Sequence, residues 1–204
     1  MNFDEFCLVL EDTRAHITSS QFHREIVDTY NSIEPLPRGY KVTMGDPWCA
    51  IYVSAMWRRH MEGWFPYECS CTRMIALGKQ QSRFFPRNEL EFAKRGYLIF
   101  YDWERDGSPD HVGYIMDVDA RANKYTVIDG NYGNRVSKRE IDIGANNIYG
   151  YISLYYPEEN EVDRAKKWAT RNRLILGDGT ADSWTKPITR EQLAVILARY
   201  HQAT

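Results

Sequence analysis

The spacing of apolar and polar positions changes twice along the chain. Residues 21–30 are amphipathic with a helical period, and the region 46–95 is predicted to be mainly helical, with loops at 63–66 and 85–86. From Gly96 onward, short runs rich in β-branched and aromatic residues are separated by Gly, Asn and Asp, a pattern typical of antiparallel strands. Helices followed by consecutive strands predict an α+β fold with N-terminal helices packed on an antiparallel sheet. The predicted strands cover residues 97–101, 111–118, 124–128, 135–141 and 148–155.

The second change falls at residues 157–160, where a proline and two glutamates interrupt the strand pattern and predict a linker. We therefore predict two domains. The first spans residues 1–156, with a helical lead-in over 1–44, and the second is a small helical hairpin over 157–204. Within the hairpin, the expected elements are a helix, a turn-rich stop and a second helix, at 161–174, 176–180 and 189–203.

Composition narrows the class of protein. The 204 residues are 43% hydrophobic, enough for one domain with a real core and a small appendage. A net charge of -2 gives no basic field that would indicate nucleic acid as a partner. The sequence has no apolar run long enough for a transmembrane helix. Residues 1–10 carry Asp4 and Glu5 and no basic segment, so we expect a protein made in the cytoplasm without a signal peptide.

The cysteine count is too sparse for a disulfide scaffold. Cys69 and Cys71 are too close in sequence for an ordinary bridge, and no further ligands nearby indicate a zinc site. We interpret them as a local structural pair of reduced thiols. A bridge from Cys7 to one of them is the alternative.

The fourth cysteine, Cys49, is the first candidate for chemistry. Asp46 is predicted as the N-cap and Pro47 as the first residue of a helix that runs to about His60. A helix N-terminus carries partial positive charge and free N–H groups, which favour a thiolate over a thiol. Cys49 is therefore a candidate nucleophile; the alternative is a small buried core cysteine.

Two later positions supply a candidate base and a group to orient it. His111 opens a predicted strand, with Gly113 leaving space beside it, and an imidazole near Cys49 could take its proton. Asp129 ends the next strand, one hairpin away, followed by Asn131. A carboxylate or amide at that place could accept the imidazole N–H. Taken singly, the first motif is more typical of a strand-end histidine bound to Asp110, and the second of an ordinary Asp-Gly-Asn turn.

Together, four motifs resemble the CHAP family (cysteine, histidine-dependent amidohydrolases/peptidases), whose fold is papain-like. The resemblance covers about residues 40 to 155. It is carried by Trp48-Cys49-Ala50, by residues 96–103 (GYLIFYDW), by Asp110-His111-Val112-Gly113-Tyr114 and by Ile128-Asp129-Gly130-Asn131.

The resemblance implies a role for each matched residue. Cys49 falls on the family's nucleophile and His111 on its general base. The family's usual Glu falls on Asp129, which would orient His111, while Asn131 matches the polar assistant. The change from Glu to Asp shortens the carboxylate, so Asn131 is the alternative orienting residue. Three neighbours of the predicted site are candidate substrate-binding residues: Trp48, Trp103 and Asp110.

The acidic segment before His111 partly imitates a calcium loop. Asp102, Glu104 and Asp106 alternate and are followed by Gly107, as in the first half of an EF-hand. The bidentate Glu expected at the end of such a loop is missing, because Gly113 stands there. We therefore expect an acidic hairpin loop and no cofactor, with a calcium site as the less favoured alternative.

The tail has a resemblance of its own. Residues 161–203 resemble one S-layer-homology repeat, through Trp168-Ala169, residues 174–180 (LILGDGT) and residues 188–194 (ITREQLA). Such repeats are associated with binding of cell-wall polymers, usually as three copies forming one site. A single copy implies either a homo-oligomer assembled through 157–204 or a small wall-binding or packing element.

The sequence as a whole predicts a bacteriolytic hydrolase of the cell wall. The CHAP resemblance implies cleavage of a peptidoglycan amide by a cysteine nucleophile, as an N-acetylmuramoyl-L-alanine amidase or an endopeptidase. The absence of a signal peptide favours an endolysin-like enzyme that reaches the wall after phage lysis or non-classical export. The alternatives are a cysteine peptidase or toxin amidase with another substrate, and a non-catalytic wall-binding module.

Overall fold

A computed structural model describes residues 1–16, 20–89, 93–154, 191 and 193–196 of the chain. By its internal contacts the chain divides into two compact units, Met1–Tyr156 and Pro157–Thr204. In the second unit, the described residues 193–196 are helical, within the helix expected at 189–203. The other predictions for the tail lie outside the described residues: the linker at 157–160, the helix at 161–174 and the turn at 176–180.

Helices dominate the first eighty residues. The first, α1, begins with a capping box: Asn2 accepts a hydrogen bond from the Glu5 backbone N–H at 3.0 Å, and Glu5 accepts one from the Asn2 N–H at 3.1 Å. The amphipathic helix predicted over 21–30 is confirmed as α2. No helix among the described residues is long and apolar enough to cross a bilayer. The helical elements are α1 (Phe3–Asp12), η1 (Thr13–His16), α2 (Ser20–Asn31), η2 (Pro37–Gly39), α3 (Cys49–His60) and α4 (Cys71–Gln80).

Six antiparallel strands form one sheet in the order β1-β6-β2-β3-β4-β5. This confirms the α+β class and the antiparallel sheet. One expectation is wrong: residues 85–86 are not a loop but part of β1, whose three residues include Pro86 and pair with β6 at the sheet edge. A strand this short has too few residues to show alternation. The strands are β1 (Phe84–Pro86), β2 (Leu98–Tyr101), β3 (His111–Asp119), β4 (Lys124–Asp129), β5 (Ser137–Asp142) and β6 (Ile148–Ile152).

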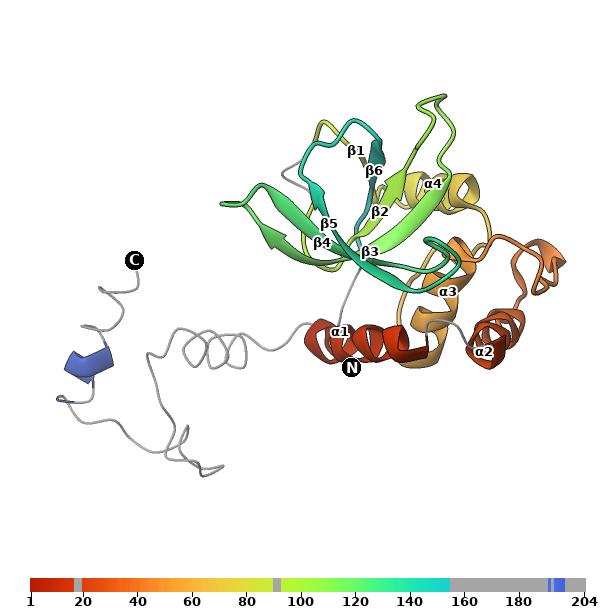
Figure 1. Cartoon of the computed structure of the whole chain (residues 1–204), viewed down its shortest axis with the longest axis horizontal. Coiled ribbons are helices and arrows are strands. Elements are labelled where there is room, and N and C mark those ends of the chain that lie inside the picture. Colours follow the sequence, from red (N-terminus) through yellow and green to blue (C-terminus); the bar gives the residue numbers. More distant parts are fainter. Residues whose placement is uncertain (17–19, 90–92, 155–190, 192, 197–204) are drawn as a thin grey trace. The chain divides into compact units, whose positions relative to one another are not determined.

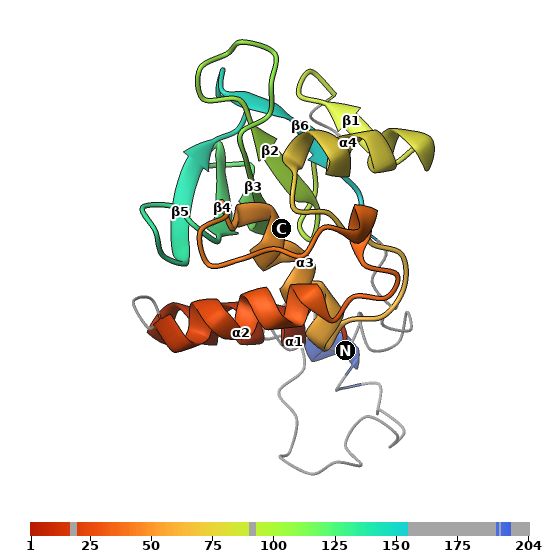
Figure 2. The ribbon, with the colours of Figure 1, turned by 90° about the vertical axis from the view of Figure 1, so that its right-hand side faces the viewer.

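One face of the sheet packs on the helices. The first nine residues of α3 are all buried, so this helix lies inside the core, with α1 and α2 gathered beside it on the same side of the sheet (Figures 1 and 2). The fully buried Tyr114 of β3 joins the two layers, because its hydroxyl donates a 2.7 Å hydrogen bond to the Val53 carbonyl of α3. This hydrogen bond therefore fixes the position of α3 along the strands that it crosses.

The opposite face of the sheet closes over a second apolar cluster. Tyr125 of β4 and Tyr151 of β6 have ring centroids 6.1 Å apart, although β2 and β3 lie between their strands. A flat sheet would hold β4 and β6 about 14 Å apart, so this contact indicates a curled sheet. His111 and Asp129 lie at one end of this concave face, where β3 begins and β4 ends.

Two glycines permit close approaches at that end of the sheet. A Cβ at Gly130 would lie 2.4 Å from the Cβ of Tyr52, so this glycine lets α3 approach the end of β4. A Cβ at Gly113 would lie 1.9 Å from Oδ1 of Asp129. The space expected beside His111 is therefore present, and the Asp129 carboxylate fills it.

The Tyr114 hydrogen bond gives a test of the helix–sheet packing. We expect Tyr114→Phe to lower the free energy of unfolding by about 1 kcal/mol, because a buried hydrogen bond is lost while the ring remains. Urea unfolding followed by circular dichroism measures this change. Tyr149→Phe is the matched control: Tyr149 is only partly buried and packs by its ring against Phe84. Equal effects of the two substitutions would contradict the assigned role of the Tyr114 hydroxyl.

Candidate active site

Cys49 is the first residue of α3, and the helix begins two residues later than predicted. Trp48 occupies the N-cap position without a side-chain cap. Asp46 is not the N-cap, because its carboxylate accepts hydrogen bonds from the Thr43 backbone N–H at 2.7 Å and the Thr43 hydroxyl at 2.9 Å. Asp46 thus closes the turn that precedes the helix. The correction makes Cys49 the first helical residue, and its backbone N–H is one of the free N–H groups of the first turn.

The Cys49 thiol is buried beside a second cysteine. Its Sγ lies 3.8 Å from the carbonyl oxygen of Asp110 and is in hydrogen-bonding contact with the thiol of Cys71, the first residue of α4. The Cys71 thiol, then His111 and the Ala50 backbone N–H, lower the pKa of Cys49 well below its usual range, although burial opposes this. The same contact, together with burial, raises the pKa of Cys71 well above its usual range. The proton therefore stays on Cys71, and Cys49 ionises first.

His111 opens β3 and is 6% exposed. Its Nε2 lies 3.8 Å from Oδ1 of Asp129, and the Cys49 sulfur is a second neighbour of the ring. Burial disfavours the charged ring, but Asp129 and the Cys49 sulfur outweigh burial and raise the pKa of His111 to about 9. A low thiol pKa and a high imidazole pKa together favour a thiolate–imidazolium pair at neutral pH.

Asp129 is fully buried at the end of β4, and its two oxygens have different surroundings. Oδ2 accepts hydrogen bonds from Arg139 Nε at 2.7 Å and Nη2 at 2.5 Å. Oδ1 faces His111 and has no hydrogen-bond partner within the described residues. The gap of 3.8 Å is longer than a hydrogen bond, in keeping with the short reach expected of an Asp. Hydrogen bonds between catalytic groups often shorten when substrate binds.

Asn131 is the other orienting candidate, and the structure places it differently. It lies in the turn after β4 with a left-handed backbone (φ 61°), and its side chain makes no hydrogen bond to any residue in the described ranges. Of the two candidates, Asp129 is thus the one found in contact with His111.

The aromatic candidates differ in exposure. Trp48 is 5% exposed: its ring packs on His23 with centroids 4.9 Å apart, and its Nε1 donates to Asn134 at 3.3 Å. Trp103 is only half-buried, stacks on Tyr101 at 4.7 Å and lies 5.9 Å from the His111 ring. Trp48 therefore supports the start of α3 from within, whereas Trp103 has surface available beside His111.

The acidic loop before His111 binds its own backbone. Asp110 Oδ2 accepts from the Trp103 N–H at 2.7 Å, and the Asp102 oxygens accept from the N–H groups of Asp106 and Gly107 at 3.1 and 2.9 Å. Asp110 thus fixes the loop beside Cys49 through one of its carboxylate oxygens. In the parts of the chain with described structure, no group of three side chains is arranged to hold a metal ion, and Asp102, Glu104 and Asp106 form none.

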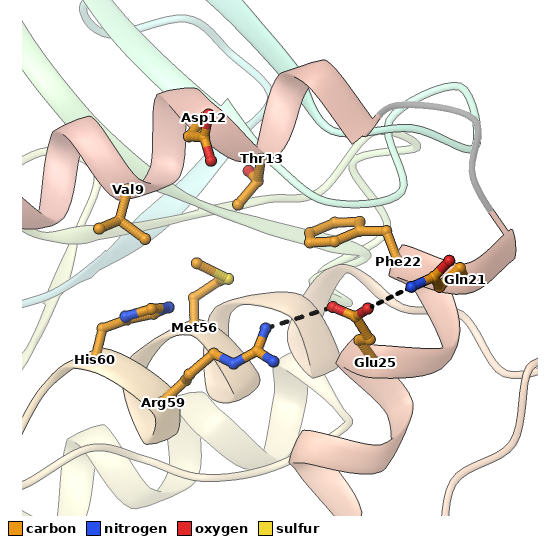
Figure 3. Close-up of a pocket in the computed structure, with 9 residues that line it drawn as sticks. All are labelled: Val9, Asp12, Thr13, Gln21, Phe22, Glu25, Met56, Arg59 and His60. Carbon is orange, nitrogen blue, oxygen red and sulfur yellow. Dashed lines mark hydrogen bonds and ion pairs between the residues drawn. The ribbon is translucent and has the colours of Figure 1, made fainter.

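Two surface pockets lie elsewhere. One of about 490 Å³ opens between α1, α2 and α3 (Figure 3), with the Glu25–Arg59 ion pair of 3.7 Å in its wall. Another of about 510 Å³ lies near η2 and the end of α4. Neither is lined by Cys49, His111 or Asp129. The first is lined by Val9, Asp12, Thr13, Gln21, Phe22, Glu25, Met56, Arg59 and His60.

Two residues of the site were not predicted as part of it. Cys71 was paired with Cys69, but the structure separates them: Cys69 accepts from Arg38 Nη2 at 3.3 Å, whereas Cys71 contacts Cys49. All four cysteines are free. Ser70 before a helical run was the available signal for a second cysteine at a helix start. Arg139 carried no signal, because its place beside Asp129 depends on the β4–β5 register.

Comparisons with models of known protein families, with curated proteins and with solved structures found no match to this chain.

The contact between the two helix-start cysteines gives a second test. We expect Cys71→Ala to move the pH midpoint for alkylation of Cys49 by iodoacetamide upward, because the largest influence that lowers the Cys49 pKa is removed. The rate is measured by mass spectrometry of the peptide that contains Cys49. Cys69→Ala is the control, since its thiol contacts Arg38 instead. An unchanged midpoint in Cys71→Ala would show that Cys71 does not stabilise the thiolate.

Proposed function

We propose that this protein is a cysteine hydrolase with a papain-like fold of the CHAP type, and that it cleaves an amide bond of bacterial peptidoglycan. One observation carries the proposal: a buried cysteine at a helix start, with a lowered pKa, is in contact with a histidine whose pKa is raised to about 9. Such a pair is the activated nucleophile of cysteine hydrolases.

The reaction would proceed in two steps. The Cys49 thiolate attacks the amide carbonyl carbon, and His111, protonated on Nδ1, gives that proton to the nitrogen of the leaving amine as the C–N bond breaks. A water then loses a proton to His111 and attacks the thioester carbonyl. This releases the acid and restores the thiolate and imidazolium. Asp129 stabilises the charged ring from the Nε2 side.

The developing oxyanion needs donors close to Cys49. The backbone N–H of Cys49 is the natural donor, because the first N–H groups of α3 have no partner inside the helix. The half-buried ring of Trp103 could bind an apolar part or a sugar face of the substrate.

Peptidoglycan is proposed as the substrate from the resemblance of the four motifs to CHAP hydrolases. The S-layer-homology resemblance of residues 161–203 supports the same target, through a wall polymer. Action at the wall after phage lysis or non-classical export belongs to this proposal. A homo-oligomer assembled through residues 157–204 is also part of this proposal.

Replacing the nucleophile tests the proposal directly. We expect Cys49→Ala to lower the rate of turbidity loss of purified cell walls by at least about a thousandfold, because no other group forms the acyl-enzyme. Cys69→Ala should clear walls at the wild-type rate. Undiminished clearing by Cys49→Ala would overturn the assignment of the nucleophile. Absence of clearing by the wild type on every wall type, with cleavage of a protein or another amide, would favour a peptidase or toxin amidase.

The bond that is cut can be identified from the products. Mass spectrometry of digested muropeptides should show either of two patterns. Intact stems with a free N-terminal alanine would indicate an amidase, and shortened stems or opened cross-bridges would indicate an endopeptidase. Products cut between sugars would contradict cysteine amide hydrolysis.

The two pKa shifts set the pH range of activity. Activity requires ionised Cys49, whose pKa is lowered, and protonated His111, whose pKa is raised to about 9. We therefore expect kcat/KM to remain high through neutral pH and to fall as His111 loses its proton near pH 9. Hydrolysis of a soluble muropeptide measured across pH tests this. A basic limb near the ordinary imidazole value of 6.5 would contradict the close contact of His111 with Asp129 and Cys49.

A further inference from the structure

We propose that Arg139 is a positioning residue of this site: its guanidinium fixes the Asp129 carboxylate so that the remaining oxygen faces His111. A catalytic role for this site rests on the proposed function. The contact of Arg139 with Asp129, called the clamp below, rests only on the arrangement of four strands.

One edge of the guanidinium donates two hydrogen bonds to a single carboxylate oxygen. Nε and Nη2 of Arg139 both donate to Oδ2 of Asp129, at 2.7 and 2.5 Å. With Oδ2 occupied twice, the carboxylate plane is fixed, and Oδ1 is directed over Gly113 toward His111 Nε2. A carboxylate without this clamp could rotate about its Cβ–Cγ bond and lose that direction.

Arg139 is itself held in place. It lies on β5 opposite Val127 of β4, two residue pairs away from Asp129, and on the same face of the sheet. Its guanidinium carbon lies 3.9 Å from the ring centroid of Tyr132, with Tyr101 and Trp103 at 5.3 and 5.6 Å. The side chain is only 15% exposed. A planar, permanently charged group inside an aromatic enclosure has few alternative positions.

The charge balance explains why a clamp is needed. Four titratable side chains face Asp129 within the described structure: His111, Arg139, Tyr101 of β2 and Tyr52 of α3. Burial raises the pKa of both tyrosines, so they are neutral at working pH. His111 alternates between charged and neutral during catalysis. Among the residues that the structure describes around Asp129, Arg139 therefore supplies the counter-charge that remains when His111 is neutral, and a buried carboxylate without it would be costly.

The proposal predicts the titration of His111. Asp129 is the largest influence that raises the His111 pKa, so losing the clamp should lower it. In Arg139→Met we expect the NMR titration midpoint of the His111 ring to fall from about 9 toward 6.5, by about one pH unit or more. Arg139→Lys keeps the charge but loses one of the two hydrogen bonds to Asp129, so its His111 midpoint should fall less. The kcat/KM of Arg139→Met should be lower than that of the wild type, and its decrease on the basic side should begin at lower pH.

The controls separate positioning from folding. Arg121→Met removes an exposed arginine at the far end of the β3–β4 hairpin and should leave the midpoint unchanged. If Arg139→Met fails to fold, Tyr132→Leu removes the ring beneath the guanidinium while leaving the ion pair. It should shift the midpoint down by a smaller amount. Loss of thermal stability with an unchanged midpoint would show a purely structural role.

Two outcomes would overturn the proposal. An unchanged midpoint in folded Arg139→Met would mean that Asp129 needs no clamp. An increased midpoint would mean that the arginine charge merely opposes the imidazolium. The titration requires no substrate, so a wild type that clears no walls would defeat the proposed function while leaving the clamp intact. Normal clearing of walls by the wild type, together with an unchanged His111 midpoint in Arg139→Met, would defeat only the positioning role of Arg139.

Discussion

The pairing of Gly113 with Asp129 across β3 and β4 is the constraint on which the site depends. This register places the start of β3 beside the end of β4. It also turns the positions of Gly113 and Asp129 to the concave face of the sheet. Because Gly113 has no Cβ, the Asp129 carboxylate can lie over the backbone of β3 and reach toward His111. A slip of one residue would reverse the face of every side chain on the strand and separate the two groups.

Around this register, charged and neutral groups form a continuous series from one helix start to the last strands of the sheet. The neutral Cys71 thiol contacts the Cys49 sulfur, Cys49 contacts His111, His111 faces Asp129, and Asp129 is bound by Arg139. Each ionised group has an opposite charge next to it. Burial would otherwise neutralise Cys49 and His111, so their shifted pKa values result from the series as a whole.

The sequence predicts the parts of this arrangement that local signals specify. The strand pattern identifies the sheet, and Cys49, His111 and Asp129 stand where helix-start and strand-end motifs place them. Asp46 was misassigned because a helix cap and a turn favour the same residue types. The contacts of Cys71 and Arg139 could not be predicted, because they depend on how α4 approaches α3 and on the β4–β5 register.

The short carboxylate at 129 fits its surroundings better than a longer one would. Oδ1 already occupies the space that a Cβ at Gly113 would take, and Oδ2 is bound to Arg139. An added methylene would have to displace either the guanidinium or the His111 ring, since Asp129 is fully buried. An aspartate at position 129 is therefore matched to the position of Arg139. The arginine fixes the direction of a carboxylate whose reach is shorter, at the 3.8 Å separation from His111.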